Sequence, residues 1–276
     1  YDESNIRTLS SIEHIRQRPG MYIGRLGNGS HPEDGIYILL KEVIDNSIDE
    51  FMEGNGSKIV VTLEGQKCSV RDYGRGIPLN KLIECVSVIN TGAKYDNEAF
   101  QYSVGLNGVG TKAVNALSSY FEITSWREGE YMHAVFERGV LKQKKKGKGD
   151  EPNGTFVSFI PDDDPAIFGK YTYNEEYIKE RLWNYAYLNK GLTITFNGKT
   201  IRSPGGLMDL VKKILGDDGL YPLINYKSKS LEFSFTHTNG YGESYHSYVN
   251  GQYTSDGGTH EAAFKEGVLK GINEFF

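Results

Sequence analysis

The segment Glu42–Glu50 (EVIDNSIDE) constrains this chain more than any other, because carboxylate and amide side chains recur in it at the spacing of one helical turn. At ~100° per residue, its polar side chains fall within an arc of about 100°, and apolar side chains cover the opposite side of the helix. The polar set is Glu42, Asn46, Asp49 and Glu50, and the apolar set is Ile36, Leu40, Val43, Ile44, Ile48 and Phe51. The pattern predicts a helix that packs on one face and carries groups suited to a metal and a nucleotide on the other. An ordinary amphipathic helix with solvated acids is the alternative.

A second motif, Asp72–Pro78 (DYGRGIP), follows a turn at Gly54–Gly56 and an alternating strand at Ile59–Leu63. Its carboxylate stands at a strand end, before a glycine-rich turn against which a flat ring can lie closely. A carboxylate only accepts hydrogen bonds, so it suits an exocyclic amino group such as N6 of adenine. Taken alone, the motif could equally be an ordinary turn.

The third motif, Gly105–Lys112 (GLNGVGTK), leads into an expected helix from Thr111 to about Leu117. It fits neither the dinucleotide fingerprint nor the P-loop, because its glycine spacing is reversed for the first and its Thr-Lys order is reversed for the second. Its glycines still allow backbone N–H groups to approach phosphate oxygens, and the helix start directs its positive end at them. The three motifs in this order predict a nucleotide site.

Bulk composition excludes several classes of protein. With 276 residues, 38% of them hydrophobic and 24% charged, the chain can form one large domain or two modest ones. Its apolar runs are far shorter than the ~20 residues that span a bilayer, and its first residues lack a basic start, so we expect no membrane role and a cytoplasmic location. The net charge of −5 argues against a general nucleic-acid-binding surface. Cys68 and Cys85 are expected to be free thiols.

The one basic run is Lys142–Gly149, between strand-like segments at Met132–Phe136 and Thr155–Ile160. We expect it to be a solvated, mobile hairpin connection, with contact to phosphate as the less favoured alternative.

The remaining pattern predicts an α+β fold with helices layered on one face of a sheet, because strands and helices segregate rather than alternate strictly. A junction is expected at Ser203–Gly206. The segments beyond it begin a second unit that is expected to be incomplete at Phe276. Expected helices lie at 10–15, 81–90, 175–188 and 207–215, and further strands at 121–126, 192–196, 231–236 and 244–249.

Together these motifs resemble the GHKL ATPases, the family shared by gyrase, a heat-shock chaperone, mismatch-repair proteins and histidine kinases. Within that family the chain is most similar to the ATPase (B-type) subunit of bacterial type IIA DNA topoisomerases, which are topoisomerase IV and DNA gyrase. The segments that carry this resemblance are Arg18–Gly24, Asp45–Glu50, Tyr73–Pro78, Gly105–Gly110, Val114–Ser118 and Asp256–His260. Asn107 and Lys112 favour topoisomerase IV over gyrase.

The resemblance implies a Bergerat-type (GHKL) α/β sandwich over residues 1–202, with an N-terminal dimerisation arm at 1–20. The start of a transducer domain, similar to domain 2 of ribosomal protein S5, is expected over residues 203–276. A cationic lysine of the family's second domain lies beyond Phe276, so we expect weak hydrolysis of ATP by this chain.

Site residues follow from the resemblance position by position. Glu42 is implied as the general base for the attacking water, and Asn46 as the Mg²⁺ ligand. Asp72 would accept from adenine N6, with Thr155 helping through a water. The other implied nucleotide contacts are Tyr1, Glu50, Arg75, Gly76, Ile77, Pro78, Lys94, Gly105, Leu106, Asn107, Gly108, Val109, Gly110, Thr111 and Arg127.

Within that set, Gly76–Pro78 would line the base and Gly105–Thr111 would close as a lid over the phosphates. Arg127 matches a pocket-rim arginine that aminocoumarin inhibitors use, and Tyr1 would reach the nucleotide of the second copy in a dimer.

The implied function is an ATP-operated gate, in which Mg-ATP drives homodimerisation and captures a DNA segment. The implied partners are a second copy of the chain, the A-type DNA-cleaving subunit and double-stranded DNA in the full enzyme. The alternative is a nucleotide-operated clamp of the mismatch-repair or chaperone type. Arg18–Gly24 and Asp256–His260 discriminate against it, because both segments are not expected in those branches.

Overall fold

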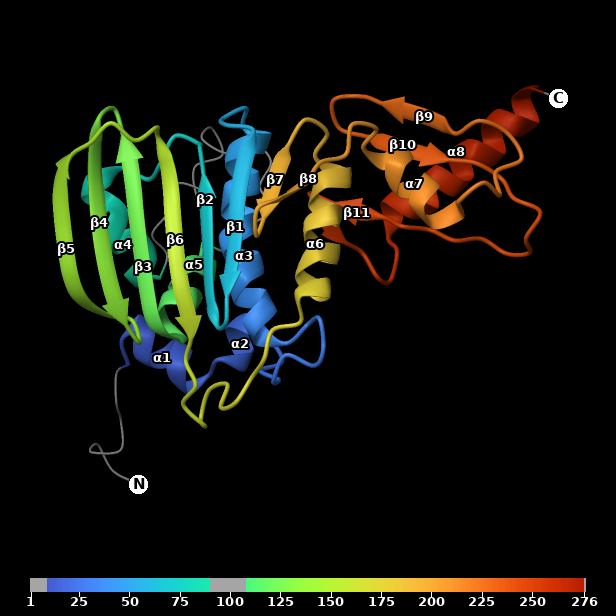
Figure 1. Cartoon of the computed structure of the whole chain (residues 1–276). Coiled ribbons are helices and arrows are strands. Elements are labelled where there is room, and N and C mark those ends of the chain that lie inside the picture. Colours follow the sequence, from blue (N-terminus) through green and yellow to red (C-terminus); the bar gives the residue numbers. More distant parts are fainter. Residues whose placement is uncertain (1–8, 90–107, 276) are drawn as a thin grey trace. The chain divides into compact units, whose positions relative to one another are not determined.

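The computed structural model describes residues 9–89 and 108–275 of the chain. It divides into two compact units, Tyr1–Gly206 and Leu207–Phe276, which are considered separately below (Figure 1). The division falls directly after the Ser203–Gly206 segment. In the described part of the chain, no helix is long and apolar enough to cross a membrane.

The first unit is built on an eight-stranded sheet with the order β5-β4-β3-β6-β2-β1-β7-β8. Its strands are β1 (Lys58–Glu64), β2 (Lys67–Asp72), β3 (Ser118–Arg127), β4 (Glu130–Glu137), β5 (Val140–Lys148), β6 (Gly154–Pro161), β7 (Thr193–Phe196) and β8 (Lys199–Ile201). Neighbouring strands are antiparallel except β1 and β7, which run parallel with Lys58 opposite Thr193. The mixed sheet confirms the predicted α+β class.

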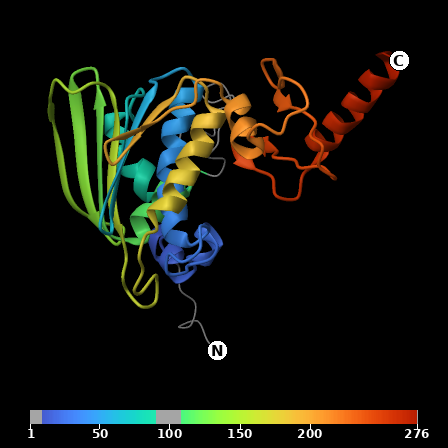
Figure 2. The ribbon, with the colours of Figure 1, turned by 45° about the vertical axis from the view of Figure 1, so that its right-hand side comes forward.

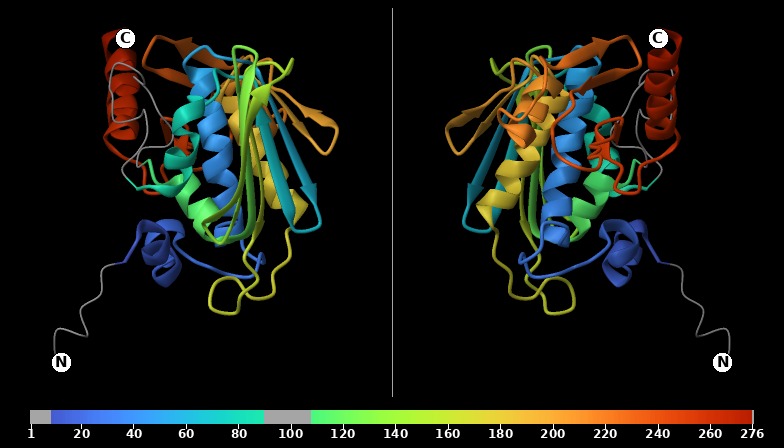
Figure 3. Two further views of the ribbon diagram at one scale, coloured as in Figure 1. Left: turned by 90° about the vertical axis from the view of Figure 1, so that its left-hand side faces the viewer. Right: turned by 90° about the vertical axis from the view of Figure 1, so that its right-hand side faces the viewer.

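Helices cover one face of this sheet (Figures 2 and 3). They are α1 (Ser11–Gln17), α2 (Gly20–Ile23), α3 (Gly35–Met52), α4 (Leu82–Ser87), which follows the short 3-10 helix η2 (Leu79–Lys81), α5 (Gly110–Ala116) and α6 (Glu175–Leu188). Of these, α3 contacts β2 and β6, and α5 contacts β3, β4 and β6. The layer arrangement places α3 and α5 side by side over the middle of the sheet.

The core forms between these layers because α3 presents its predicted apolar stripe to the sheet. Ile36, Ile44 and Ile48 are at most 1% exposed, and they belong to the same buried cluster as Phe121 and Phe159 of the sheet. Each such side chain contributes about 1.5–3 kcal/mol of transfer free energy. The stripe therefore fixes which face of α3 is left for polar groups.

A buried carboxylate fixes the start of α3. Both carboxylate oxygens of Asp34 are used: Oδ2 accepts from the backbone N–H groups of Gly29 (2.9 Å) and His31 (3.2 Å), and Oδ1 pairs with Arg25 at 2.7 Å. Gly35 follows without a Cβ, since one would lie 2.7 Å from a methyl carbon of Ile23. These contacts tie the start of α3 to the loop that precedes it.

The basic run does not form the predicted mobile connection. Its lysines belong to β5, a regular edge strand that pairs with β4 and whose residues are almost all exposed. Lys142 and Lys146 pair with Glu137 and Glu130 of β4, at 3.4 and 3.6 Å. Lysines on an edge strand keep it solvated and hinder pairing with another chain, so composition alone could not distinguish this strand from a loop.

The second unit contains α7 (Leu207–Leu215), β9 (Ile224–Lys227), β10 (Glu232–Phe235), β11 (Tyr248–Val249), β12 (Gln252–Tyr253) and α8 (Thr259–Phe275). The strand predicted at 244–249 is shorter than expected, because only Tyr248 and Val249 pair with β12. The ring of Phe264 on α8 packs 5.1 Å from Phe233 and 5.7 Å from Phe235 between ring centroids. None of the residues described along α8 is fully buried.

Candidate nucleotide site

Asp72 lies at the end of β2, whose buried positions alternate and place Cys68, Val70 and Asp72 on the helix-covered face. Its Oδ1 accepts from the backbone N–H groups of Gly74 (2.9 Å) and Thr155 (3.2 Å). Burial raises the pKa of this carboxyl group to about 6, and the two backbone donors oppose that rise. At neutral pH the carboxyl group of Asp72 is therefore mainly ionised, and it is a buried hydrogen-bond acceptor.

Ser47 of α3 donates its hydroxyl to the other oxygen, Oδ2 of Asp72, at 3.4 Å. Sequence reasoning missed this residue. Ser47 lies one helical turn after Val43 in the buried stripe, and a polar residue within an apolar stripe was the available signal. The contact joins the helix to the end of β2.

The turn after Asp72 is held from the side of α3 by Glu50. Its carboxylate accepts from the Arg75 backbone N–H at 2.8 Å and from the Arg75 guanidinium at 2.9 and 3.1 Å. A Cβ on Gly74 would lie 2.8 Å from the Glu50 side chain, so only glycine fits there. Glu50 and Arg75 thus bind each other and shape the turn, and their predicted contact with nucleotide stays a prediction.

Strand β3 holds the same turn from the other side. Arg127 donates to the carbonyl of Gly76 at 3.2 Å, and the Ser125 hydroxyl donates to the carbonyl of Ile77 at 2.8 Å. Gly76 has φ +76°, and a Cβ there would lie 2.6 Å from the Trp126 carbonyl oxygen. The glycine is required both by its backbone conformation and by the approach of β3.

Arg71 strengthens this frame from the uncovered face of the sheet. Its guanidinium carbon lies 4.3 Å from the ring centroid of Trp126 and 4.6 Å from that of Tyr73, and it donates to the Pro152 carbonyl at 2.7 Å. Such stacking of a guanidinium between rings fixes the strand ends around Asp72. Nothing in the sequence indicates this role, because it depends on which strands are neighbours.

Glu42 and Asn46 lie at the other end of the site, where α3 meets α5. The Asn46 amide donates to the Glu42 carbonyl at 2.8 Å and to the Thr111 hydroxyl at 3.0 Å. A Cβ on Gly110 would lie 1.9 Å from Glu42 Oε2, so the carboxylate packs directly over the start of α5. Two predicted site residues of α3, Glu42 and Asn46, are thereby brought together with Thr111, which is 65 residues from Asn46 in the sequence.

If Mg²⁺ binds at this end of the site, Asn46 is the residue expected to hold it. The described residues contain no cluster of three or more His, Cys, Asp or Glu side chains that could hold a metal ion. Mg²⁺ commonly takes one or two protein oxygens together with phosphates and waters. Since the Asn46 amide nitrogen is engaged as a donor, its side-chain oxygen is the atom of suitable chemistry. The residues present therefore fit the implied ion.

Lys112 is buried at the same end of the site, with 3% of its surface exposed, and it hydrogen-bonds the carbonyl of Gly108. It holds the turn before α5, where Gly108 has φ +60°.

Asp49, expected on the polar face of α3, is also buried, at 1% exposed. Because Asp49 is buried, the polar face of α3 that remains accessible is narrower than its helical periodicity predicts.

Five predicted nucleotide contacts lie outside the described residues. These are Tyr1, Lys94, Gly105, Leu106 and Asn107. The other predicted residues fall into two groups, one around Asp72 and one around Glu42, and α3 contributes to both.

Comparison with known proteins first defines the class. Residues 31–165 match the family model described as histidine kinase-, DNA gyrase B-, and HSP90-like ATPase, and residues 193–276 match the DNA gyrase B model. The first match covers α3, the turn after Asp72, α5 and Thr155. All the site residues that the structure describes therefore lie within the ATPase match.

Relatives define the family within that class. The chain is 57% identical over 276 residues to the B subunit of DNA topoisomerase 4 from Borreliella burgdorferi, covering 100% of this chain and 46% of the relative. It is 36% identical over 299 residues to the B subunit of DNA gyrase from Thermus thermophilus, again covering 100% of this chain and 46% of the relative. The chain thus spans less than half the length of these relatives.

A solved structure agrees with the relatives. The crystal structure of the 43K ATPase domain of Thermus thermophilus gyrase B in complex with an aminocoumarin matches with a TM-score of 0.78 at 30% identity, covering 97% of this chain and 73% of that one. The chain belongs to the family of bacterial type IIA topoisomerase B subunits, the ATPase subunits of DNA gyrase and topoisomerase IV.

Proposed function

We propose that the chain is the ATP-binding and ATP-hydrolysing gate of a bacterial type IIA topoisomerase, of the topoisomerase IV kind rather than gyrase. One observation carries the proposal: a single helix, α3, contributes Ser47 to the buried Asp72 and presents Glu42 and Asn46 to the start of α5. A ligand that spans both ends needs an amino-bearing ring at one end and anionic groups at the other. ATP has this chemistry.

At the adenine end, Asp72 is the acceptor for the exocyclic amino group. Its Oδ1 already takes two backbone donors, and these hold the carboxylate in one orientation. Such a buried acceptor rejects a ring that presents a carbonyl at that position, because two acceptors would then face each other without a proton. The pocket is therefore expected to prefer adenine to guanine.

At the phosphate end, Glu42 orients and deprotonates the attacking water, and the side-chain oxygen of Asn46 would hold Mg²⁺. Bound Mg²⁺ supplies neutralisation of the phosphate charge. Phosphoryl transfer needs positioning and charge stabilisation more than covalent catalysis, so the contribution of this chain is to hold a water, a base and backbone N–H donors around the terminal phosphate. The glycines from Gly108 to Gly110 allow that close approach.

We infer the wider function from what the family resemblance implies. Mg-ATP would drive two copies of the chain to dimerise, with Tyr1 of each reaching the nucleotide of the other, and the dimer would capture a DNA segment for the A-type subunit. Identity of 57% to the B subunit of a topoisomerase 4 supports topoisomerase IV. The match of residues 193–276 to the DNA gyrase B model argues against a mismatch-repair or chaperone clamp. Aminocoumarins are expected to bind near Arg127.

Calorimetric titration with a non-hydrolysable ATP analogue and Mg²⁺ tests the proposal. Wild type should bind, and Asp72→Ala should bind at least about 100-fold more weakly, as expected for loss of a buried charged acceptor. Asp217→Ala is the matched control, because Asp217 is an exposed acid of the second unit and belongs to neither group of site residues. Equal binding by wild type and Asp72→Ala would contradict the assignment of the pocket.

A further inference from the structure

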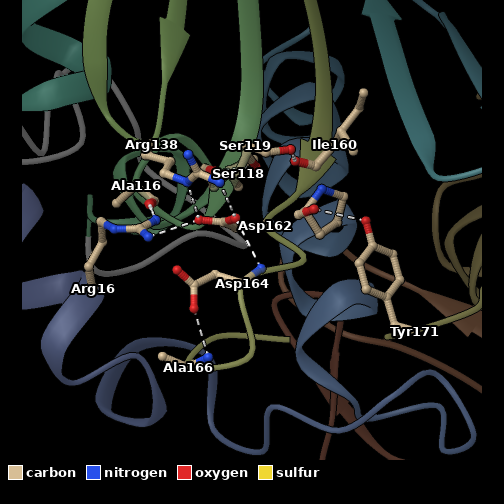
Figure 4. Close-up of polar contacts among 12 residues, drawn as sticks. Arg16, Ala116, Ser118, Ser119, Arg138, Ile160, Asp162, Asp164, Ala166 and Tyr171 are labelled. Carbon is tan, nitrogen blue, oxygen red and sulfur yellow. Dashed lines mark hydrogen bonds and ion pairs between the residues drawn. The ribbon is translucent and has the colours of Figure 1, made fainter. Parts of the chain in front are cut away.

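The carboxyl end of α5 is a junction of three chain segments. The carbonyl of Ala116 accepts from the Arg16 guanidinium (2.8 Å), and that of the C-cap residue Leu117 accepts from the Asp162 backbone N–H (2.9 Å). Next in the chain, the carbonyl of Ser118 at the start of β3 accepts from the Arg138 backbone N–H (2.9 Å). The last carbonyls of a helix have no partners within the helix, so these contacts satisfy groups that would otherwise be buried unpaired. Figure 4 shows the junction.

Asp162 is the centre of the junction. Its side chain is fully buried, and it pairs with Arg16 at 2.8 Å and with Arg138 at 2.9 Å (Figure 4). Burial by itself raises the pKa of this carboxyl group, but hydrogen bonds from Arg138 and Arg16 outweigh it and leave the pKa below its usual value. The carboxylate is therefore ionised and doubly paired.

The two arginines differ in where they attach the carboxylate. Arg16 lies on α1 and donates both to Asp162 and to the Ala116 carbonyl, so it joins α1 directly to α5. Arg138 lies in the turn between β4 and β5, and two nitrogens of its guanidinium donate to the two oxygens of Asp162, at 2.9 and 3.2 Å. Because both arginines contact the same carboxylate, a substitution at Arg138 is a matched control for a substitution at Arg16.

Helix α1 is the element that Arg16 attaches to this junction, so it is placed to respond to changes in α5. It begins at a capping box formed by Ser10 and Glu13, and it buries Ile15 completely. The opposite end of α5 lies at the nucleotide site, where Gly110 contacts Glu42 and Thr111 accepts from Asn46. One short helix therefore has the phosphate end of the site at its start and Arg16 at its end.

We propose that Arg16 is the positioning residue that couples the nucleotide site to α1, by tying α1 to the carboxyl end of α5 through Ala116 and Asp162. The proposal rests on the function proposed above, since it requires nucleotide to order the start of α5. If nucleotide orders α5, that ordering is passed to α1, because the Arg16 guanidinium donates both to the Ala116 carbonyl and to Asp162. Because α1 lies within the segment expected to form the dimerisation arm, the same contact would connect nucleotide binding to that arm.

An arginine is needed because two contacts are made in different directions. The guanidinium presents a fork of N–H donors, so one nitrogen can serve the carbonyl while another serves the carboxylate. A lysine ammonium is a compact charge without that geometry, and Arg16→Lys should keep the pairing with Asp162 but weaken the coupling. Removing Arg16 leaves Asp162 paired with Arg138, so the variant should still fold.

Hydrogen exchange with a binding measurement tests the proposal on the full chain. Wild type, Arg16→Met and Arg138→Met are compared with and without the ATP analogue and Mg²⁺, at concentrations where sedimentation shows monomers. Methionine keeps an apolar stem and removes the hydrogen bonds. In wild type and Arg138→Met, nucleotide should slow exchange both at the start of α5 and in residues 11–17, the latter at least about fivefold. In Arg16→Met the protection of α5 should remain, and that of residues 11–17 should fall below about twofold.

Three results would overturn the coupling: no protection of residues 11–17 in wild type, equal protection in Arg16→Met, or equal loss in Arg138→Met, which would indicate a merely structural junction. The calorimetric isotherm separates this failure from failure of the proposed function. If wild type does not bind the analogue at all, the nucleotide site itself is wrong and the coupling fails with it.

Discussion

The two ends of the candidate site are built in different ways. Around Asp72, the backbone donors come from turns and strands whose register is fixed by the sheet, and they hold the acceptor in place. Around Glu42, the described contacts join two helices, α3 and α5, through Asn46, Thr111 and Gly110. Strand ends held in place by the sheet suit recognition of a flat base, while the start of a helix suits phosphates.

This contrast predicts that substitutions around Asp72 change the affinity for nucleotide, while substitutions around Glu42 change the rate of hydrolysis. A buried, pre-oriented acceptor favours bound adenine in ground state and transition state alike, so it should affect affinity. A carboxylate beside the phosphates acts on the reacting water, so it should affect rate. Substitutions at the two ends are therefore expected to have separable effects.

The largest expected effect is on turnover. Glu42→Gln keeps the size of the side chain over Gly110 but removes the base, so ATP hydrolysis by the chain, which is expected to be weak already in wild type, should fall by a further ~10²–10⁴-fold. Affinity for the non-hydrolysable analogue should change by less than about threefold. Steady-state kinetics with calorimetry checks both values. A loss of affinity as large as the loss of rate would contradict the separation of the two ends.

Asp72→Asn should have the reverse effect. The amide oxygen can still accept from Gly74 and Thr155, but its nitrogen replaces an acceptor with a donor toward the base. Affinity for the analogue should fall by about 10–100-fold, as for a lost charged hydrogen bond. Competition between ATP and GTP analogues adds a second readout, because preference for adenine should shrink in the variant. An unchanged preference would exclude Asp72 as the base-reading group.

The same substitution should stabilise the chain without ligand. The folded pKa of Asp72 is about 6, raised by burial from an ordinary value of 3.8, so the ionised carboxylate destabilises the folded state increasingly as pH rises through this window. Below about pH 4 both states are protonated and no penalty exists. Asp72→Asn should therefore unfold with a free energy about 1–3 kcal/mol larger at pH 7, with the gain vanishing near about pH 4. Urea titrations at several pH values measure it, and a gain independent of pH would show another cause.

Ser47→Ala should give the smallest effect. It removes the donor to Asp72 Oδ2 at 3.4 Å, a long hydrogen bond, and costs about 0.5–1.5 kcal/mol of folding stability. Analogue affinity should weaken by only a few-fold, with turnover at saturation unchanged. Ser87→Ala is a control, since Ser87 donates to a helix carbonyl on α4 instead. A loss of turnover in Ser47→Ala would mean that the two ends are not independent.

The local placement of the candidate site residues was predictable from the sequence, while their roles toward a nucleotide stay predictions. The helix face of Glu42 and Asn46, the acceptor at Asp72 and the glycine turn after it all follow from spacing and residue type within short segments. Steric needs at Gly74 and Gly110 become clear only from the side chains that approach them, Glu50 and Glu42. Those approaches depend on packing between elements that periodicity cannot place.

Long-range pairings were beyond the sequence for the same reason. The contacts of Ser47 with Asp72 and of Arg16 with Asp162 join residues far apart in the chain, and nothing local marks them as partners. The lysine strand β5 shows the opposite failure, since its composition indicates a loop although its pairing with β4 makes it a strand. In each case the structure that a residue adopts, or the partner that it binds, is determined by which segment packs beside it.

A crystal structure of the chain with the ATP analogue and Mg²⁺ would show both ends of the site at once. We expect adenine N6 within hydrogen-bond distance of Asp72 and the terminal phosphate at the start of α5, with Glu42 facing it. A base bound away from Asp72, or phosphates bound away from Gly110, would contradict the proposal that α3 joins the two ends of one nucleotide site.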